Sequence, residues 1–253
     1  MGLWWEVTGA PDAEVVVLVP GRGDSSDLWP PEFRDALVAG GFRVLAFDPR
    51  DTGASDASEG YDLAAMADDV IVVLDAAGID RAHVAGLSMG GFITIDLATR
   101  HRERFASLCF LSAMSPDPDA GFGPQFFVEG DTDPVEAHLA AMGSPSDDDR
   151  AWVVARVEAA RVRTPLRPDA VERHQAAAFR SAFPELDSLG EIDAPVLVVH
   201  GGVDQVLPVA HAETLAAGIP GARLLVLDDM GHLPTPEQWS VIADATTAHL
   251  ADA

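Results

Sequence analysis

The sequence contains no lysine, so all 16 of its basic residues are arginines, and they face 41 aspartates and glutamates. The formal net charge of the 253-residue chain is −25 at pH 7. Nucleic acids and anionic membranes bind to basic surfaces that neutralise their phosphate groups. The charge balance therefore argues against both kinds of partner and leaves a small molecule as the expected one.

Cysteine and long apolar runs are scarce as well. Cys109 is the only cysteine, so no internal disulfide can form and a reducing compartment is expected. The N-terminus lacks a basic segment, and no apolar run is long enough for a signal peptide or a membrane span. The hydrophobic fraction of 48% still excludes general disorder. These features predict a soluble, cytoplasmic, globular protein.

Short apolar runs alternate with amphipathic segments along most of the chain. Continuous apolar strands separated by helices are typical of a parallel sheet that is covered on both faces. The predicted strands are 13–20, 42–48, 81–87, 105–113, 195–200 and 223–228, and the predicted helices are 31–39, 62–77, 89–101, 209–218 and 236–250. The pattern predicts an α/β fold with a doubly wound, mostly parallel sheet.

The alternation is interrupted before the last two strands. Residues 115–189 are rich in proline and contain helical periods such as Val135–Met142 and Asp149–Val162. We interpret this segment as a helical lid inserted into a core formed by residues 1–114 and 190–253.

A Gly-x-Ser-x-Gly motif, Gly86-Leu87-Ser88-Met89-Gly90, lies where a predicted strand meets a predicted helix. In that context the motif is typical of a nucleophilic serine on a tight turn, because the turn leaves no room for side chains two residues to either side. The N-terminus of the following helix favours a developing negative charge. Ser88 is therefore the predicted nucleophile.

A serine nucleophile needs a base and an acid that orients it. Asp204 and His232 each follow a predicted strand, in the order Ser88, Asp204, His232 that this architecture requires. Asp117 and Asp119, after the strand at 105–113, are the alternative acids.

The oxyanion hole is expected to use two backbone N–H groups, those of Met89 and Arg22. The histidines lack the spacing of metal ligands, and no nucleotide-binding glycine motif is present. No metal and no cofactor are expected.

The chain resembles the α/β-hydrolase superfamily over nearly its whole length outside the lid. Within it, the chain is similar to aclacinomycin methylesterase-type esterases of antibiotic pathways. The segments that carry this similarity are residues 29–33 (WPPEF), 48–55 (DPRDTGAS) and 78–90 (GIDRAHVAGLSMG). The resemblance implies an α/β-hydrolase fold and a hydrolase without a cofactor.

The leading functional hypothesis is a serine hydrolase that cleaves a carboxylic ester of a small or natural-product-type substrate through an acyl-enzyme. The alternatives are a lactonase, a thioesterase, a C–C hydrolase, a cofactor-free perhydrolase, or a non-hydrolytic biosynthetic enzyme of the cyclase type. A ligand-binding protein with a silent triad is a further class. The sequence does not predict the oligomeric state.

The arginines cluster between residues 150 and 180, where seven of them face three acidic residues, a net charge of +4. The remaining nine arginines face 38 acidic residues, a net charge of −29. Either these arginines pair with carboxylates of the core and hold the lid closed, or some face the pocket and attract an acidic substrate. Arg156 and Arg163 are the candidates for the second role, and Trp29 is a candidate for the pocket wall.

Overall fold

A seven-stranded sheet forms the centre of the protein. The computed structural model describes residues 1–126, 133–163, 167, 169–182 and 185–253. Its strands are β1 (Trp5–Thr8), β2 (Val15–Val19), β3 (Arg43–Phe47), β4 (Ala82–Leu87), β5 (Phe105–Leu111), β6 (Val196–Gly201) and β7 (Arg223–Leu227). The strand order is β1-β3-β2-β4-β5-β6-β7, and every neighbouring pair is parallel except β1 with β3. The predicted doubly wound, mostly parallel sheet is confirmed.

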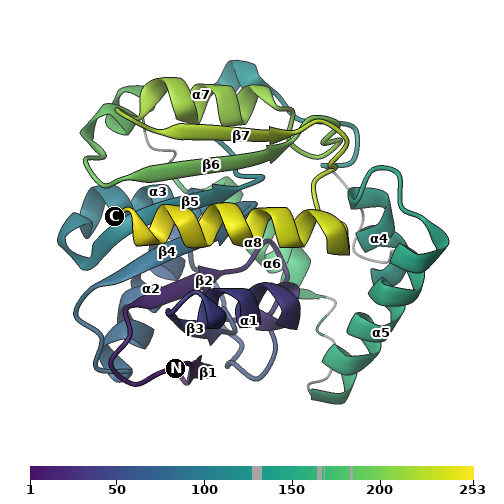
Figure 1. Ribbon diagram of the computed structural model, residues 1–253, viewed down its shortest axis with the longest axis horizontal. Helices are drawn as coiled ribbons and strands as arrows, with labels where there is room; N and C mark the ends of the chain where they lie inside the picture. The colour runs from purple at the N-terminus through teal and green to yellow at the C-terminus, as the bar shows by residue number, and fades with distance from the viewer. Residues whose placement is uncertain (127–132, 164–166, 168, 183–184) are drawn as a thin grey trace.

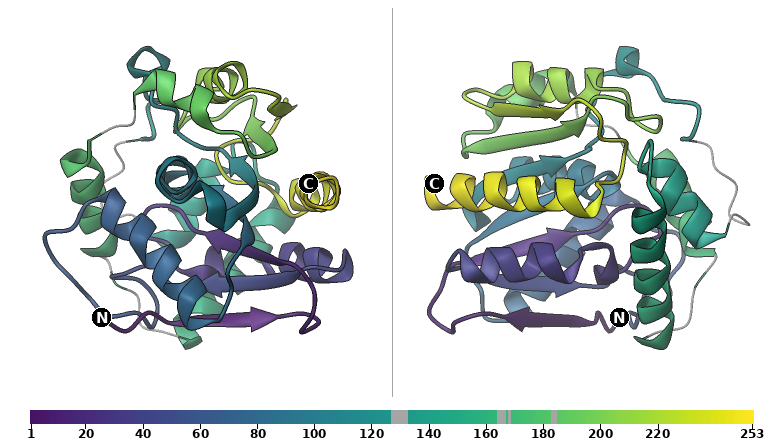
Figure 2. Two further views of the ribbon diagram at one scale, coloured as in Figure 1. Left: turned by 90° about the vertical axis from the view of Figure 1, so that its left-hand side faces the viewer. Right: turned by 45° about the vertical axis from the view of Figure 1, so that its right-hand side comes forward.

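Helices cover both faces of the sheet (Figures 1 and 2). The helices are α1 (Pro31–Ala39), α2 (Leu63–Ala76), α3 (Met89–Arg100), α4 (Pro134–Ala141), α5 (Asp147–Arg163), α6 (Asp169–Arg180), α7 (Ala210–Gly218) and α8 (Pro236–Ala251). Four short 3₁₀ turns occupy Ser26–Leu28, Arg102–Arg104, Pro118–Ala120 and Leu186–Glu191. Side chains of α1 and α8 form one apolar layer, and those of α2, α3 and α7 form the layer on the opposite face.

The central strands form because their residues are apolar on both faces. All five residues of β2 and all six of β4 are buried. Strand β1 was not expected from the sequence. It has four residues whose burial alternates, and it pairs antiparallel with β3 at the edge of the sheet. An edge strand with one exposed face lacks the continuous apolar run that predicted the other strands.

Helices α4, α5 and α6 fall between β5 and β6, so the predicted helical insertion is present in the chain order. Figure 1 shows α4 and α5 beside one end of the sheet. Parts of the segment predicted as a lid, residues 127–132, 164–166, 168 and 183–184, lie outside the described residues. The division into a core and a lid at residues 115 and 189 stays a prediction. None of the helices that the structure describes is long and apolar enough to cross a membrane.

Helix α3 lies unusually close to β2 because Gly90 has no side chain. A Cβ built on Gly90 would be 2.1 Å from the Val19 carbonyl oxygen and 2.6 Å from that of Pro20. Both neighbours are backbone atoms, which cannot rotate away as a flexible side chain can. This contact fixes the position of the helix that follows Ser88.

We expect Gly90→Ala to lower the free energy of unfolding by about 1–3 kcal/mol, the usual cost of overpacking a core. The measurement is equilibrium unfolding in urea. Gly190→Ala is the matched control, because a Cβ at Gly190 meets no atom within 4 Å. Equal stabilities of the two variants would contradict the tight packing of α3 on β2.

Candidate active site

Ser88 lies on the turn between β4 and α3, in a backbone conformation that is rare for a residue with a side chain. Its φ is 57° and its ψ is −119°. The turn closes because Gly86 has no Cβ; one built there would lie 2.4 Å from the Gly90 carbonyl oxygen and 2.5 Å from Thr94 Oγ1. The Ser88 N–H donates to the Leu111 carbonyl of β5 at 2.9 Å. The Ser88 hydroxyl therefore faces the space beyond the strand ends.

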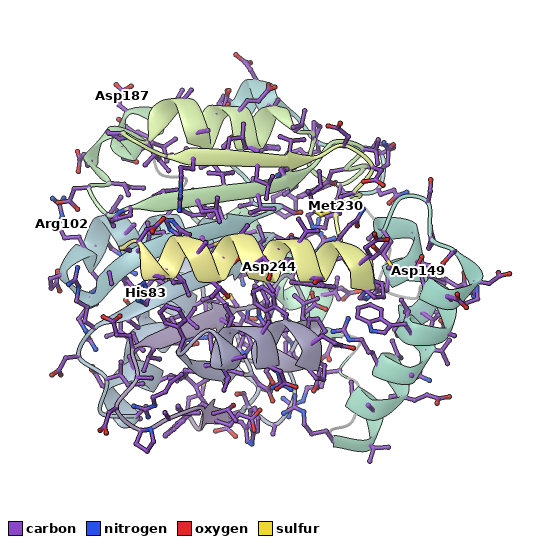
Figure 3. All side chains as sticks on the ribbon, viewed as in Figure 1. His83, Arg102, Asp149, Asp187, Met230 and Asp244 are labelled. Carbon is purple, nitrogen blue, oxygen red and sulfur yellow. The ribbon has the colours of Figure 1, made fainter. Side chains whose placement is uncertain are left out.

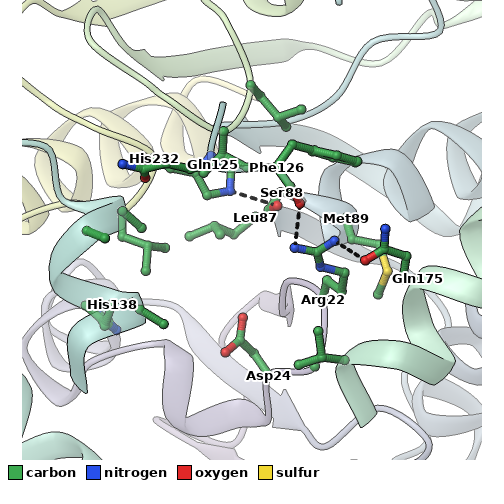
Figure 4. Close-up of a pocket in the computed structure, with 18 of the residues that line it drawn as sticks. Arg22, Asp24, Leu87, Ser88, Met89, Gln125, Phe126, His138, Gln175 and His232 are labelled. Carbon is green, nitrogen blue, oxygen red and sulfur yellow. Dashed lines mark hydrogen bonds between the residues drawn. The ribbon is translucent and has the colours of Figure 1, made fainter. Parts of the chain in front are cut away.

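His232 lies between the hydroxyl of Ser88 and the carboxylate of Asp204. The Ser88 Oγ to His232 Nε2 distance is 2.9 Å (Figure 4). The His232 Nδ1 to Asp204 Oδ2 distance is 2.7 Å. An ionised carboxylate can only accept, so Nδ1 carries the proton and Nε2 is free to accept the serine proton. The structure thus brings the three residues predicted as a triad into one hydrogen-bonded chain.

Asp204 is held by the backbone that follows it. Its Oδ1 accepts hydrogen bonds from the N–H groups of Val206 and Leu207, at 2.7 and 2.9 Å. Burial alone raises the pKa of Asp204, but the charge and hydrogen bond of His232, together with His200 and the Leu207 N–H, lower it below its ordinary value. Asp204 is therefore a carboxylate at neutral pH, as the orienting acid of a triad must be.

The alternative acids do not contact His232. Asp117 Oδ1 accepts from the N–H of Asp119, and its Oδ2 accepts from the Thr214 hydroxyl at 3.1 Å. Asp119 is exposed. The geometry favours Asp204 over both.

Of the two predicted oxyanion donors, Met89 directly follows Ser88, and Arg22 follows Gly21, where an added Cβ would lie 3.4 Å from Ser88 Cβ. Met89 is the first residue of α3, and within the described part of the chain neither its N–H nor that of Arg22 has a hydrogen-bond acceptor. Free N–H groups beside a nucleophile are what a developing oxyanion requires.

Helix α6 supports the loop that carries Arg22. His174 Nδ1 accepts from the Gly23 N–H, and its Nε2–H donates to the Arg50 carbonyl, both at 2.9 Å. Burial lowers the pKa of His174, which keeps the neutral tautomer that these two bonds need. A neutral His174 thereby fixes the backbone beside the expected oxyanion donor.

A cavity of about 800 Å³ opens above Ser88. Most of its wall is apolar, with Met89, Met114 and Leu233 among the lining residues. Its polar lining includes the side chains of Arg22, Asp24, His138 and Gln175 (Figure 4). A mostly apolar cavity with a few polar groups is typical of a small-molecule site.

Comparison with known proteins agrees with the fold. The family model of the alpha/beta hydrolase fold matches residues 14–237. The chain belongs to the α/β hydrolase family.

Its relatives include enzymes of more than one specificity. RutD of Variovorax paradoxus (strain S110), whose name assigns it a carbamate hydrolase activity, is 34% identical over 248 residues, which cover 92% of this chain and 90% of RutD. Rhodomycin D methylesterase DnrP of Streptomyces peucetius is 29% identical over an alignment of 280 positions, which covers 98% of this chain and 94% of DnrP. The crystal structure of a hydrolase from Pseudomonas aeruginosa PA01 superposes with a TM-score of 0.79 at 30% identity, covering 98% and 94% of the two chains. The expected similarity to methylesterases is confirmed.

Three predicted substrate-binding residues of this α/β hydrolase lie outside the cavity wall. Trp29 is fully buried and stacks on Phe33, 5.3 Å between ring centroids. Arg156 donates to the carbonyls of Asp27 and Leu28, and Arg163 bridges the carboxylates of Asp27 and Asp48. In the structure none of the three lines the cavity, and both guanidinium groups bind acceptors on the core. The expectation that these residues contact substrate stays a prediction.

Other polar groups of the cavity were not found from the sequence. Gln175 and His138 are single residues of inserted helices, and only the folding of those helices over the strand ends brings them near Ser88. The Arg22 side chain was missed although its N–H was predicted as a donor, and Asp24 lies two residues further along the same loop. The one sequence feature that could have indicated these two cavity residues was the position of their loop directly after a strand.

We expect Arg163→Gln to lower the free energy of unfolding by about 1–3 kcal/mol, because the substitution leaves the fully buried Asp48 carboxylate without its counter-charge. Arg161→Gln is the control, since Arg161 makes no ion pair within the described residues. Urea unfolding gives the stability difference. A stability equal to wild type, with a raised KM for an anionic ester alone, would return Arg163 to the substrate pocket.

Proposed function

We propose that this hydrolase is a serine esterase that cleaves carboxylic esters through an acyl-enzyme. The observation that carries the proposal is the hydrogen-bonded chain from Ser88 Oγ to His232 Nε2 and from His232 Nδ1 to Asp204 Oδ2, at 2.9 and 2.7 Å. The methylesterase relative, which the alignment covers almost completely, supports an ester as the substrate.

The reaction begins when Ser88 Oγ attacks the ester carbonyl carbon and its proton moves to His232 Nε2. Asp204 stabilises the resulting imidazolium, and the N–H groups of Met89 and Arg22 donate to the oxyanion. The carbon–oxygen bond to the alcohol then breaks, and His232 gives its proton to the departing oxygen. Water, deprotonated by His232, attacks the acyl-enzyme and releases the acid and free Ser88.

The cavity suits a small or natural-product-sized acyl or alcohol group, because its volume is about 800 Å³ and its wall is largely apolar. The RutD relative points to carbamates as a second class that the same attack could cleave. Methyl esters and methyl carbamates with the same acyl skeleton would separate the two classes by their kcat/KM values. A higher kcat/KM for the carbamates would contradict the esterase proposal and favour a carbamate hydrolase.

We expect Ser88→Ala to lower kcat by at least roughly a thousandfold, because only binding and the oxyanion donors would be left. The measurement is turnover of an activated aryl ester, together with mass spectrometry after treatment with a serine-reactive phosphonate. The wild-type protein should gain the phosphonyl group on Ser88, and the variant should not. Near-normal turnover in a folded Ser88→Ala protein would exclude the serine mechanism.

We expect Asp204→Asn to lower kcat by roughly a thousand- to ten-thousandfold, because the amide stabilises the wrong tautomer of His232. Asp117→Asn is the matched control and should stay close to wild type, since Asp117 pairs with Thr214 away from His232. Steady-state kinetics with one ester compares all three proteins. A severe loss of kcat in Asp117→Asn with a mild one in Asp204→Asn would show that Asp117, and not Asp204, is the acid of the triad.

A further inference from the structure

The carboxylate of Asp24 lines the cavity without a partner. Within the described part of the chain, no hydrogen bond or ion pair joins either of its oxygens to another residue. Figure 4 shows the carboxylate turned into the cavity. Removing a carboxylate from water without pairing it is costly, so an unpaired one inside a cavity points to a group that arrives with the ligand.

Asp24 is also close to the nucleophile. A Cβ built on Gly21 would lie 3.0 Å from Asp24 Oδ2 and 3.4 Å from Ser88 Cβ. The carboxylate and the Ser88 side chain therefore border the same small space above Gly21. A substrate whose carbonyl carbon sits at Ser88 Oγ would place a group a few bonds away beside Asp24.

The nearby guanidinium groups donate to other residues, and of their nitrogens only Nη1 of Arg156 is buried without a partner among the described residues. Arg22 donates to Gln175 Oε1 at 2.7 Å and to the Phe126 carbonyl at 3.1 Å, and its guanidinium lies 5.4 Å from the centre of the Phe126 ring. Arg156 donates to two backbone carbonyls at 2.6 Å. Neither arginine comes within ion-pair distance of Asp24, although both lie near enough to act on its charge.

The negative net charge of the whole chain also favours a cationic ligand. A formal net charge of −25 raises the local concentration of cations and lowers that of anions. Two arginines of the arginine-rich segment, Arg163 and Arg173, pair with the core carboxylates Asp48 and Asp51, whereas Arg167 of that segment lines the cavity. Figure 3 shows two of the exposed acidic residues, Asp187 and Asp244, on the outer surface.

We propose that the Asp24 carboxylate binds a cationic group of the substrate, so that this hydrolase prefers esters that carry an ammonium group near the scissile bond. The inference rests on the proposed esterase function and names the substrate class of the same site. Contact between the ammonium group and Asp24 is made in the ground state and in the transition state, and it therefore acts on kcat/KM.

The preference depends on the ionisation of Asp24. Burial raises the pKa of Asp24 to about 6, against the opposing effect of Arg22, Arg156 and His232. The other titratable groups of the cavity wall are Asp133, Glu136, His138 and Arg167. Burial lowers the pKa of His138 to about 4, so His138 is neutral above pH 5. Asp24 is charged above pH 6 and loses its charge as the pH falls through 6, and the preference for a cation is lost with it.

The experiment compares each cationic ester with its neutral isostere. A trimethylammonium group and a tert-butyl group have the same shape, and the former keeps its charge at every pH. One pair carries the group on the alcohol side, as in acetylcholine and 3,3-dimethylbutyl acetate, and a second pair carries it on the acyl side. The quantity measured is the ratio of kcat/KM values within a pair, which cancels every effect of pH that is common to both esters.

In the wild-type protein at pH 7.5, we expect a ratio of roughly ten or more in at least one pair, the size of a charge-assisted contact. The ratio should fall as the pH is lowered through 6. In Asp24→Asn the ratio should fall roughly tenfold and lose its pH dependence, because the cationic ester loses more of its kcat/KM than the neutral one. Glu136→Gln removes another carboxylate from the cavity wall, one already paired with Arg150, and should leave the ratio unchanged.

Equal ratios in wild type and Asp24→Asn would overturn the inference, and so would a preference for an ester of the same length that carries a carboxylate. If Asp24→Asn does not fold, the pH dependence of the wild-type kcat/KM ratio is the test. A ratio that is constant from pH 5 to 8 overturns the inference by itself. Failure of the esterase proposal has a different signature. Neutral esters would then not be cleaved and Ser88 would not be acylated.

Discussion

The backbone of Ser88 is the constraint on which the rest of the site depends. A side-chain-bearing residue at φ 57° and ψ −119° costs on the order of 1–3 kcal/mol, and it persists only where the surroundings leave no alternative. Here β4, α3 and the β2 backbone meet where Gly86 and Gly90 have no Cβ, and β5 binds the Ser88 N–H. Packing of the sheet thus offsets the cost of this backbone conformation. The conformation directs the Ser88 hydroxyl out of the sheet, beside the free N–H of Met89. The positions of His232 and Asp204 matter only because this hydroxyl is fixed.

Most of the core could be predicted from the sequence because its strands are buried on both faces. A strand such as β2 is a continuous run of Val and Leu, and all five of its residues are buried. The triad was predictable for a related reason, since parallel strands bring the residues after their carboxyl ends to one edge. Strand β1 was missed because its four residues alternate between partly buried and exposed. Helix α6 was missed because its residues 169–180 are rich in charge and are buried only at Ala170, His174 and Ala177.

Contacts between the inserted helices and the core could not be predicted, since they join residues far apart in the sequence. Arg163 contacts Asp48 across 115 positions and Asp27 across 136. From the sequence, the arginines could either pair with core carboxylates or face the pocket. The folded chain distinguishes these two roles because it shows which carboxylates are buried. Asp48 and Asp51 are fully buried and need cations, whereas Asp24 stands in the cavity with none at ion-pair distance. Two of the arginines that suggested an acidic substrate, Arg163 and Arg173, are paired with these core carboxylates.

Helix α6 couples the substrate cavity to the reacting atoms. Its His174 holds the Gly23 N–H, its Gln175 accepts from the Arg22 side chain, and its Val171 lies against Gly23, where an added Cβ would be 2.4 Å from Val171 Cγ2. All three contacts fall on the loop that supplies both the Arg22 N–H and the Asp24 carboxylate. A displacement of α6 would therefore move an oxyanion donor and a substrate-binding group together. Changes in the inserted helices of this hydrolase should for that reason alter kcat along with KM, even where the altered residue touches no substrate.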